Sequence, residues 1–307
     1  MCLQLEMVAL AVQQHNTEGD MREFVITTDS TVDLPKEYME EKKVPVISLS
    51  YIIDGETYKD MEGLSSKEFF DKIRNGSMPT TSQVNPEQAK EALEPILKEG
   101  KDVLHLGFSS GLSGSYNSER MAGDELKEEY PDAKIYIVDS LCASMGQGLL
   151  LSKIIALKEA GKTIDEIYEW VESNKLKICH TVTVDDLNHL HRGGRVSKAT
   201  AVLGTLVKIK PIIYLSDTGK LEVVDKERGR KKSLHKIVDM MMEQSVGCEN
   251  DEIMITHGDC LDDAQYVESI VKDKMPSVKV LINPIGSVIG SHTGPGVVAV
   301  FYMGNKR

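Results

Sequence analysis

The sequence is short of positive charge. Its 307 residues include 48 Asp and Glu against 36 Lys and Arg, which gives a formal net charge of -12 at pH 7. Binding to nucleic acid or to an anionic membrane surface requires a positive field, either overall or strongly clustered. We therefore expect no nucleic-acid partner, and any anionic ligand must be met by a local group of donors.

Cysteine pairs are also missing. The five cysteines include no C-x-x-C motif, and an odd number does not suit a disulfide framework. This usage is typical of free thiols in a reducing compartment. We expect a cytoplasmic protein with no metal site and no cofactor.

Long apolar runs and repeats are absent as well. The patch MVALAV, within residues 1–22, lacks a preceding basic region and is too short to span a bilayer, so we expect neither a signal peptide nor an integral membrane segment. We interpret residues 1–22 as an extension. The remaining chain, in a sequence that is 41% hydrophobic and 27% charged, suits a globular protein of two ordinary domains.

Strands and helices alternate over residues 23–177. Apolar runs that end in polar residues, at 23–30, 102–108 and 133–140, are each followed by a helical pattern. This alternation predicts an α/β domain with a parallel sheet covered on both faces. From residue 178 to 307 a strand, helical pieces and an antiparallel hairpin turning at 217–219 predict a mixed α+β domain. We expect the ligand site between the two domains.

Local signals mark several turns and helix starts. Residues 79–83, PTTSQ, have the composition of a polar loop. Hairpin and capping signals occur at Asp54-Gly55, Ser65 with Glu68, Asn85 before Pro86, and Thr163 with Glu166.

Polar side chains gather where the predicted parallel strands end. Ligands of open α/β sheets bind outside the carboxyl ends of the strands, so we expect the site at this edge, covered by the second domain. The residues are Asp29 and Ser30, Ser109 and Ser110, and Asp139 and Ser140.

The turn GFSSG, residues 107–111, matches the G-x-S-x-G pattern of a nucleophile elbow, with Ser109 as nucleophile. Glycines at 111 and 114 delay the helix, and no HGG-type oxyanion loop precedes the turn. His257 or His292 would have to supply the base. A serine hydrolase is therefore the alternative hypothesis.

The favoured interpretation of the same turn is binding. Its glycines let backbone N–H groups face a ligand at the start of a helix, and Ser110, Ser113 and Ser115 add hydroxyl donors. Such a turn binds an oxyanion. No Walker A ending follows, so a nucleoside triphosphate is not favoured, while a phosphorylated small molecule is a third hypothesis.

Seven segments, in order along residues 23–307, together resemble the DegV family. They are TDSTVDLP (28–35), PTTSQ (79–83), SSGLSGSY (109–116), VDS (138–140), DDLNHLHRGGRVSK (185–198), GTLVKIKPII (204–213) and SHTGPG (291–296).

The resemblance implies two α/β domains with a long-chain fatty acid such as palmitate, stearate or oleate buried between them, presented to a fatty acid kinase. It implies no catalytic role for this chain. Thr81 and Ser113 would bond the carboxylate, with Ser82, Ser110 and Gly111 adjacent. His292 and Arg192 or Arg195 would lie near the head group. Val84 departs from the proline expected after TSQ, and Ser115 from a common threonine.

Two further sets of residues are hypotheses. The stretch 226–236 crowds cations at the start of a helix, where the dipole disfavours them. A solvated helix face is one explanation of this charge run. The other is a docking patch for an acidic protein surface or a phosphorylated head group, which would include Arg228 and Arg230, with Arg228 the better family match. Candidates for the apolar lining are Ile52, Leu112, Leu203, Leu206, Val207, Ile212 and Ile285.

Overall fold

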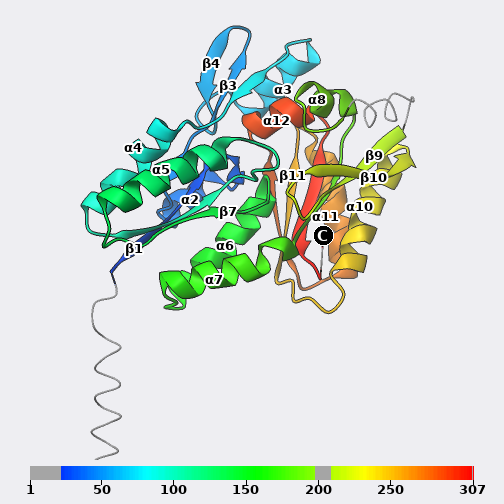
Figure 1. Cartoon of the computed structure of the whole chain (residues 1–307). Helices are drawn as coiled ribbons and strands as arrows, with labels where there is room; N and C mark the ends of the chain where they lie inside the picture. The colour runs from blue at the N-terminus through cyan, green and yellow to red at the C-terminus, as the bar shows by residue number, and fades with distance from the viewer. Residues whose placement is uncertain (1–21, 198–208, 306) are drawn as a thin grey trace, which may run out of the picture.

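The computed structural model describes residues 22–197, 209–305 and 307. The N-terminal part contains a parallel sheet of order β2-β1-β6-β7, as the strand and helix alternation predicted. Figure 1 shows helices on both faces of this sheet. The strands are β1 (Phe24–Asp29), β2 (Val46–Ile47), β6 (Asp102–Gly107) and β7 (Ile135–Asp139).

Helices α4 and α5 pack together on one face of the parallel sheet, and α6 and α7 pack together on the other side (Figure 1). The predicted N-caps at Ser65, Asn85 and Thr163 are all formed, each as a capping box. The helices of this part are η1 (Ser30–Val32, a 3-10 turn), α2 (Lys36–Glu41), α3 (Ser66–Arg74), α4 (Pro86–Lys98), α5 (Ser115–Glu129), α6 (Met145–Glu159), α7 (Ile164–Asn174) and η2 (Lys175–Lys177, 3-10).

A small antiparallel sheet of order β4-β3-β5 projects from the N-terminal part. Asp54 and Gly55, with φ of 54° and 85°, form the hairpin turn between β3 (Ser50–Ile53) and β4 (Glu56–Lys59). Residues 79–83 were expected to be a loop, but Thr80–Ser82 form β5 and pair with β3. The polar composition of these residues gives no strand signal of its own. They form a strand because they pair with the edge of β3 that β4 leaves free.

The C-terminal part contains a mixed sheet of order β10-β9-β8-β13-β11-β12, in which only β11 and β12 pair in parallel. Helices α10 and α11 cover its outer face (Figure 1). The elements are β8 (Ile178–Thr183), α8 (Leu187–Arg192), β9 (Ile209–Leu215), β10 (Leu221–Arg228), α10 (Arg230–Gln244), β11 (Glu252–His257), α11 (Leu261–Lys274), β12 (Lys279–Pro284), α12 (Ser287–Thr293) and β13 (Val298–Met303).

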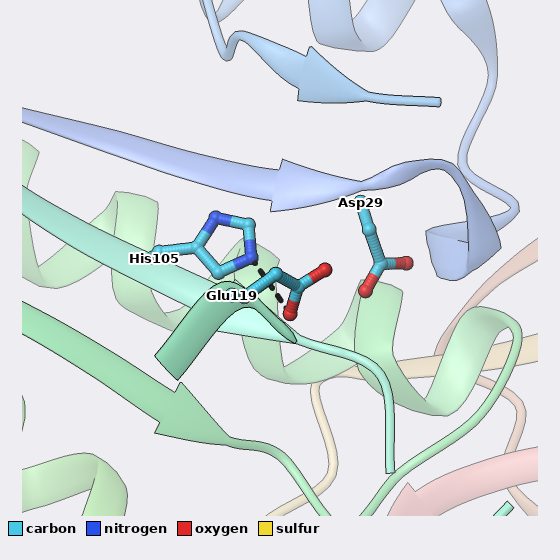
Figure 2. Close-up of side chains that lie close together, drawn as sticks. All are labelled: Asp29, His105 and Glu119. Atoms are coloured by element: carbon cyan, nitrogen blue, oxygen red, sulfur yellow. Dashed lines mark ion pairs between the residues drawn. The ribbon is translucent and has the colours of Figure 1, made fainter. Parts of the chain in front are cut away.

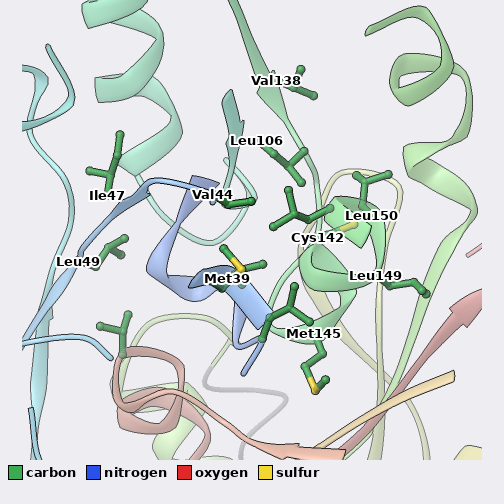
Figure 3. Close-up of a cluster of buried hydrophobic side chains, with 14 of the residues drawn as sticks. Met39, Val44, Ile47, Leu49, Leu106, Val138, Cys142, Met145, Leu149 and Leu150 are labelled. Atoms are coloured by element: carbon green, nitrogen blue, oxygen red, sulfur yellow. The ribbon is translucent and has the colours of Figure 1, made fainter. Parts of the chain in front are cut away.

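Helix α6 lies between the two sheets and joins their cores. It contacts β8, β11 and β13 as well as η1, and its sequence MGQGLLLSKII is buried on nearly every side. Figure 3 shows part of the resulting core, including Met39, Leu106 and Met145. Because one buried cluster extends from Phe24 to Phe301, the two parts share apolar packing at the place where the site is expected. Among the described residues, no helix is long and apolar enough to cross a membrane.

Candidate functional site

A cavity of about 300 Å³ lies against the inner face of the mixed sheet, under the loops that follow β6 and β7. Its volume is at the lower end of the usual range for small-molecule sites, about 300 to 1,000 Å³. Strands β8, β9 and β13 and helix α12 form much of its wall. The apolar lining is Leu49, Phe108, Leu112, Ala143, Val182, Val184, Leu190, Ile213, Leu221, Ile285, Val288, Ile289, Val297, Ala299 and Phe301.

Two polar side chains within the wall already have partners in the protein. His180 Nε2 accepts a hydrogen bond from the Ala143 N–H at 3.1 Å, and its Nδ1 lies 3.2 Å from the Ile178 carbonyl. Burial, together with nearby Arg307, holds the pKa of His180 well below its usual range, so the ring is neutral. Thr256 donates to the Asn283 carbonyl at 2.9 Å. The interior therefore suits an apolar group.

One end of the cavity is polar and is built from two distant segments. Thr81, on β5, has its hydroxyl oxygen 2.8 Å from Nε2 of His292, on α12. Burial and then Arg195 lower the pKa of His292 to about 4. The imidazole is therefore neutral at pH 7 and has one N–H to donate. This pair can donate to an anionic head group without itself carrying charge.

The serine turn closes the same end. Ser113 lines the cavity, and its hydroxyl lies 3.0 Å from that of Ser115. Ser115 in turn accepts from the Val84 N–H at 3.3 Å, which ties the turn to the segment after β5. The turn also packs against the hairpin of the mixed sheet: a Cβ at Gly111 would lie 2.5 Å from the Thr218 carbonyl. Glycine is thus needed here for close packing.

Arg195 links the serine turn to the HRGGR segment. Its Nε donates to the Leu112 carbonyl at 3.0 Å, and its Nη1 donates to the Gly193 carbonyl. Gly193 also leaves room for His292, because a Cβ there would lie 2.2 Å from the His292 Nδ1. Arg195 is therefore a half-buried cation beside the polar end, held in place by backbone carbonyls.

A second hollow of about 380 Å³ adjoins the polar end from outside. It shares Thr81, Arg195 and His292 with the inner cavity. A head group held by these residues would therefore be reachable from a polar recess. The other residues around the recess are Met78, Pro79, Thr80, His189, Arg192, Gly193 and Ser291.

The structure brings five of the predicted site residues to the inner cavity: Thr81, Ser82, Ser113, Arg195 and His292. Arg192 lies at the outer recess only, where its Nη2 is 2.8 Å from His189 Nδ1. Ser110 is exposed and its N–H donates to Asp139 at 3.1 Å. Neither Ser110 nor Gly111 lines the inner cavity.

The predicted apolar lining is correct at Leu112 and Ile285. Ile212 instead packs in the cluster with α10, and its neighbour Ile213 faces the cavity, because successive strand residues point to opposite faces. Ile52 is 38% exposed. Leu203, Leu206 and Val207 lie outside the described residues. Gln83, Phe108 and His180 also line the cavity, and no local pattern in the sequence marks them as lining residues.

The environment of Ser109 does not match a hydrolase. Its hydroxyl is buried and donates to the Gly219 carbonyl at 2.8 Å. Neither histidine considered as a base bonds it: His257 Nδ1 accepts from the Cys260 N–H, and His292 pairs with Thr81. An activated serine needs a base within hydrogen-bond reach. The geometry therefore favours a structural role for Ser109.

One cluster among the described residues could hold a metal ion: Asp29, His105 and Glu119, which are all buried (Figure 2). His105 Nε2 lies 3.2 Å from a Glu119 oxygen, and its Nδ1 lies 2.9 Å from the Thr27 hydroxyl. Asp29 already accepts from the Phe108 N–H at 2.6 Å and from Thr31. Since both Asp29 oxygens are engaged, the arrangement suits a buried polar network that supports the start of the serine turn.

The basic stretch begins at the edge of the mixed sheet. Arg228 is exposed at the end of β10. Arg230, the first residue of α10, is paired within the chain, since its Nε donates to Asp263 at 2.7 Å and its Nη1 lies 3.7 Å from Asp185. Of the two predicted docking residues, Arg228 is thus the more accessible.

Comparison with known proteins covers nearly the whole chain. The sequence profile described as an uncharacterised protein of the DegV family matches residues 23–305. A DegV domain-containing protein of Clostridium perfringens is 46% identical over 289 residues, which is 94% of this chain and 99% of that one.

Solved structures agree with the sequence comparison. A fatty-acid-binding DegV family protein from Thermus thermophilus is 30% identical with a TM-score of 0.83, covering 92% of this chain and all of that one. DegV of Bacillus subtilis, described as a fatty acid binding protein, is 28% identical with a TM-score of 0.81, covering 93% and 100%. The fold class predicted from the sequence is confirmed, and the chain belongs to the DegV family.

Proposed function

We propose that this protein binds one long-chain fatty acid, with the tail in the inner cavity and the carboxylate at the polar end. The observation that carries the proposal is the apolar cavity closed at one end by Thr81, Ser113 and His292. The description of the Thermus thermophilus and Bacillus subtilis relatives as fatty acid binders supports the same ligand class.

The tail supplies most of the binding energy. At ~0.8 kcal/mol per buried methylene, about fourteen methylenes of a palmitate-length chain give on the order of 11 kcal/mol before the costs of association. Each hydrogen bond to a charged carboxylate adds about 1.5 to 3 kcal/mol at best. The cavity wall thus sets affinity, and the polar end sets the direction in which the acid enters.

The head group is held by hydroxyl and imidazole donors, and Arg195 lines the same end of the cavity. Because the pKa of His292 is lowered to about 4, the ring offers a neutral N–H to the carboxylate at pH 7. Arg195 already uses its Nε and Nη1 to donate to two backbone carbonyls, so part of its hydrogen-bonding capacity is taken up within the protein. The acid is bound but not locked in a bidentate ion pair.

We further propose that the protein presents this carboxylate, unchanged, to a fatty acid kinase in the cytoplasm. The outer recess beside Thr81 and His292 offers a route to the head group from outside. Exposed Arg228 offers a cation to an acidic partner surface. In this proposal residues 23–177 and 178–307 act as two domains that enclose the ligand, and neither performs chemistry.

Lipid analysis tests the proposal directly. Protein purified from bacteria should release a long-chain fatty acid on denaturation, detected by mass spectrometry at close to one per chain. Delipidated protein should rebind palmitate or oleate. Absence of a co-purified acid, combined with no uptake of either added acid, contradicts the function. Kinase presentation is tested separately, by phosphorylation of the bound acid with wild-type protein and with Arg228→Ala.

A further inference from the structure

Helix α12 begins without a capping side chain of its own. Its N-cap residue is Gly286, and the first N–H groups of a helix have no partner within the helix. Two carboxylates from the N-terminal part take this role. Asp33 Oδ1 accepts from the Gly286 N–H at 2.9 Å, and Asp60 Oδ1 accepts from the Val288 N–H at 3.2 Å.

The other oxygens of this pair are also engaged. Asp33 Oδ2 accepts from the Ser144 hydroxyl at 2.5 Å, and Asp60 Oδ2 accepts from the Ser30 hydroxyl at 3.1 Å. The Asp33 carbonyl accepts from the Asn283 side chain at 2.8 Å, which adds the end of β12 to the same joint. Both carboxyls are buried, so these contacts are shielded from water.

The backbone on both sides is adapted to the contact. A Cβ at Gly286 would lie 2.4 Å from Asp33 Oδ1, so a glycine is needed for space, although its φ of -64° is open to any residue. Asp33 has a φ of 50°, a left-handed conformation that Asp and Asn tolerate better than other side chains.

The position of α12 matters because His292 lies near its other end. The helix contacts β5, which carries Thr81, and also contacts α8. A shift at the start of so short a helix would move His292 away from the 2.8 Å contact with Thr81.

We infer that Asp33 and Asp60 are positioning residues of the head-group end: they hold the start of α12, and so set where His292 lies and how fast a bound acid is released. The release part of this inference rests on the proposed function, whereas the positioning part does not.

The charged groups around the pair do not favour its ionised form. Asp33 faces Asp60 and Asp29, and neither Asp33 nor Asp60 forms an ion pair with a cation in the described parts of the chain. Burial, followed by Asp60, raises the pKa of Asp33 well above its usual range, and burial raises the pKa of Asp60 to about 6. Two buried acids are costly to place together, and the capping of α12 supplies a reason for their presence.

Alanine and asparagine variants test the inference. In Asp33→Ala and Asp60→Ala, amide hydrogen exchange over residues 286–293 should rise about tenfold in the ligand-free protein, since each variant loses a hydrogen bond that caps the start of α12. Release of a fluorescent fatty acid should quicken by a similar factor. Asn keeps an acceptor oxygen and the side-chain shape. In Asp33→Asn and Asp60→Asn, the exchange rate and the rate of fatty acid release should therefore both be close to those of wild type.

The matched control is Asp102→Ala. Asp102 is also buried and accepts a backbone N–H, that of Lys134 at 2.9 Å, but it lies at the start of β6, at the other end of the parallel sheet. This variant should lower the free energy of unfolding without raising the rate of amide hydrogen exchange locally at residues 286–293. The inference is overturned if that segment exchanges equally in wild type and in folded Asp33→Ala and Asp60→Ala, or if Asp102→Ala raises exchange there as much. If the wild-type protein binds no fatty acid, the proposed function is wrong. The exchange measurement then still tests whether Asp33 and Asp60 hold the start of α12.

Discussion

Asp29 and Asp33 lie on either side of the 3-10 turn η1, yet they face different regions of the molecule. Asp29 belongs to a network within the N-terminal part, with His105 and Glu119 (Figure 2). Asp33 joins Asp60 at the start of α12, in the C-terminal part. The first cluster supports the serine turn through the Phe108 N–H, and the second supports the helix of His292. The two clusters thus support the two segments that form the polar end of the cavity.

We expect the largest loss of stability from substitutions in the cluster of Asp29, His105 and Glu119. His105→Ala leaves the buried carboxyls of Asp29 and Glu119 without their basic neighbour and opens a cavity. We expect unfolding free energy to fall by about 3 to 5 kcal/mol, as for other broken buried pairs. Urea denaturation measures this. The double variant His105→Ala with Glu119→Ala should lose less than the sum of the single variants, because the two side chains are coupled. Simple additivity would mean that they do not interact.

The contact between Asp33 and the start of α12 should be sensitive to added side-chain volume. Gly286→Ala places a methyl group 2.4 Å from Asp33 Oδ1, so we expect a loss of about 1 to 3 kcal/mol in unfolding free energy. The same substitution in an Asp33→Ala background should cost much less, since the obstructing carboxyl is absent. Equal cost in both backgrounds, measured by urea denaturation, would show that the crowding lies elsewhere.

The sequence was informative where the signal is local. Capping pairs and the hairpin at Asp54-Gly55 follow from side chains a few residues apart, and the structure has all of them. Which face of β9 lines the cavity could not be predicted, because Ile212 and Ile213 are equally apolar and both faces are covered. The role of the Asp33 and Asp60 pair was also beyond prediction, because the backbone N–H groups that the pair caps lie more than 200 residues away.

At the polar end the expected effects are smaller. Thr81→Ala and Ser113→Ala each remove one hydroxyl, and a hydrogen bond worth about 1 kcal/mol corresponds to roughly fivefold weaker fatty acid binding. The double variant should bind more weakly than either single variant. Ser110→Ala serves as the comparison, since Ser110 does not line the inner cavity. Displacement of a fluorescent fatty acid measures the fatty acid affinity of all four variants. A larger effect of Ser110→Ala than of Ser113→Ala would reassign the head group to the exposed side of the turn.

The two clusters should also differ in the pH range over which they affect stability. Burial, and then Glu119, raises the pKa of Asp29 from 3.8 to about 7, whereas burial raises that of Asp60 from 3.8 to about 6. Because the folded protein holds each proton more tightly than the unfolded chain does, each carboxyl stabilises the fold fully below about pH 4 and loses that contribution as pH rises through its folded pKa. Asp60→Asn should therefore flatten the pH dependence of stability between about pH 4 and 6, and Asp29→Asn should flatten it up to about pH 7. Urea denaturation of each variant and of wild type across this range measures the difference. A variant whose difference from wild type stays constant over its window would mean that its carboxyl titrates normally in the folded protein, and that burial is offset by the hydrogen bonds it accepts.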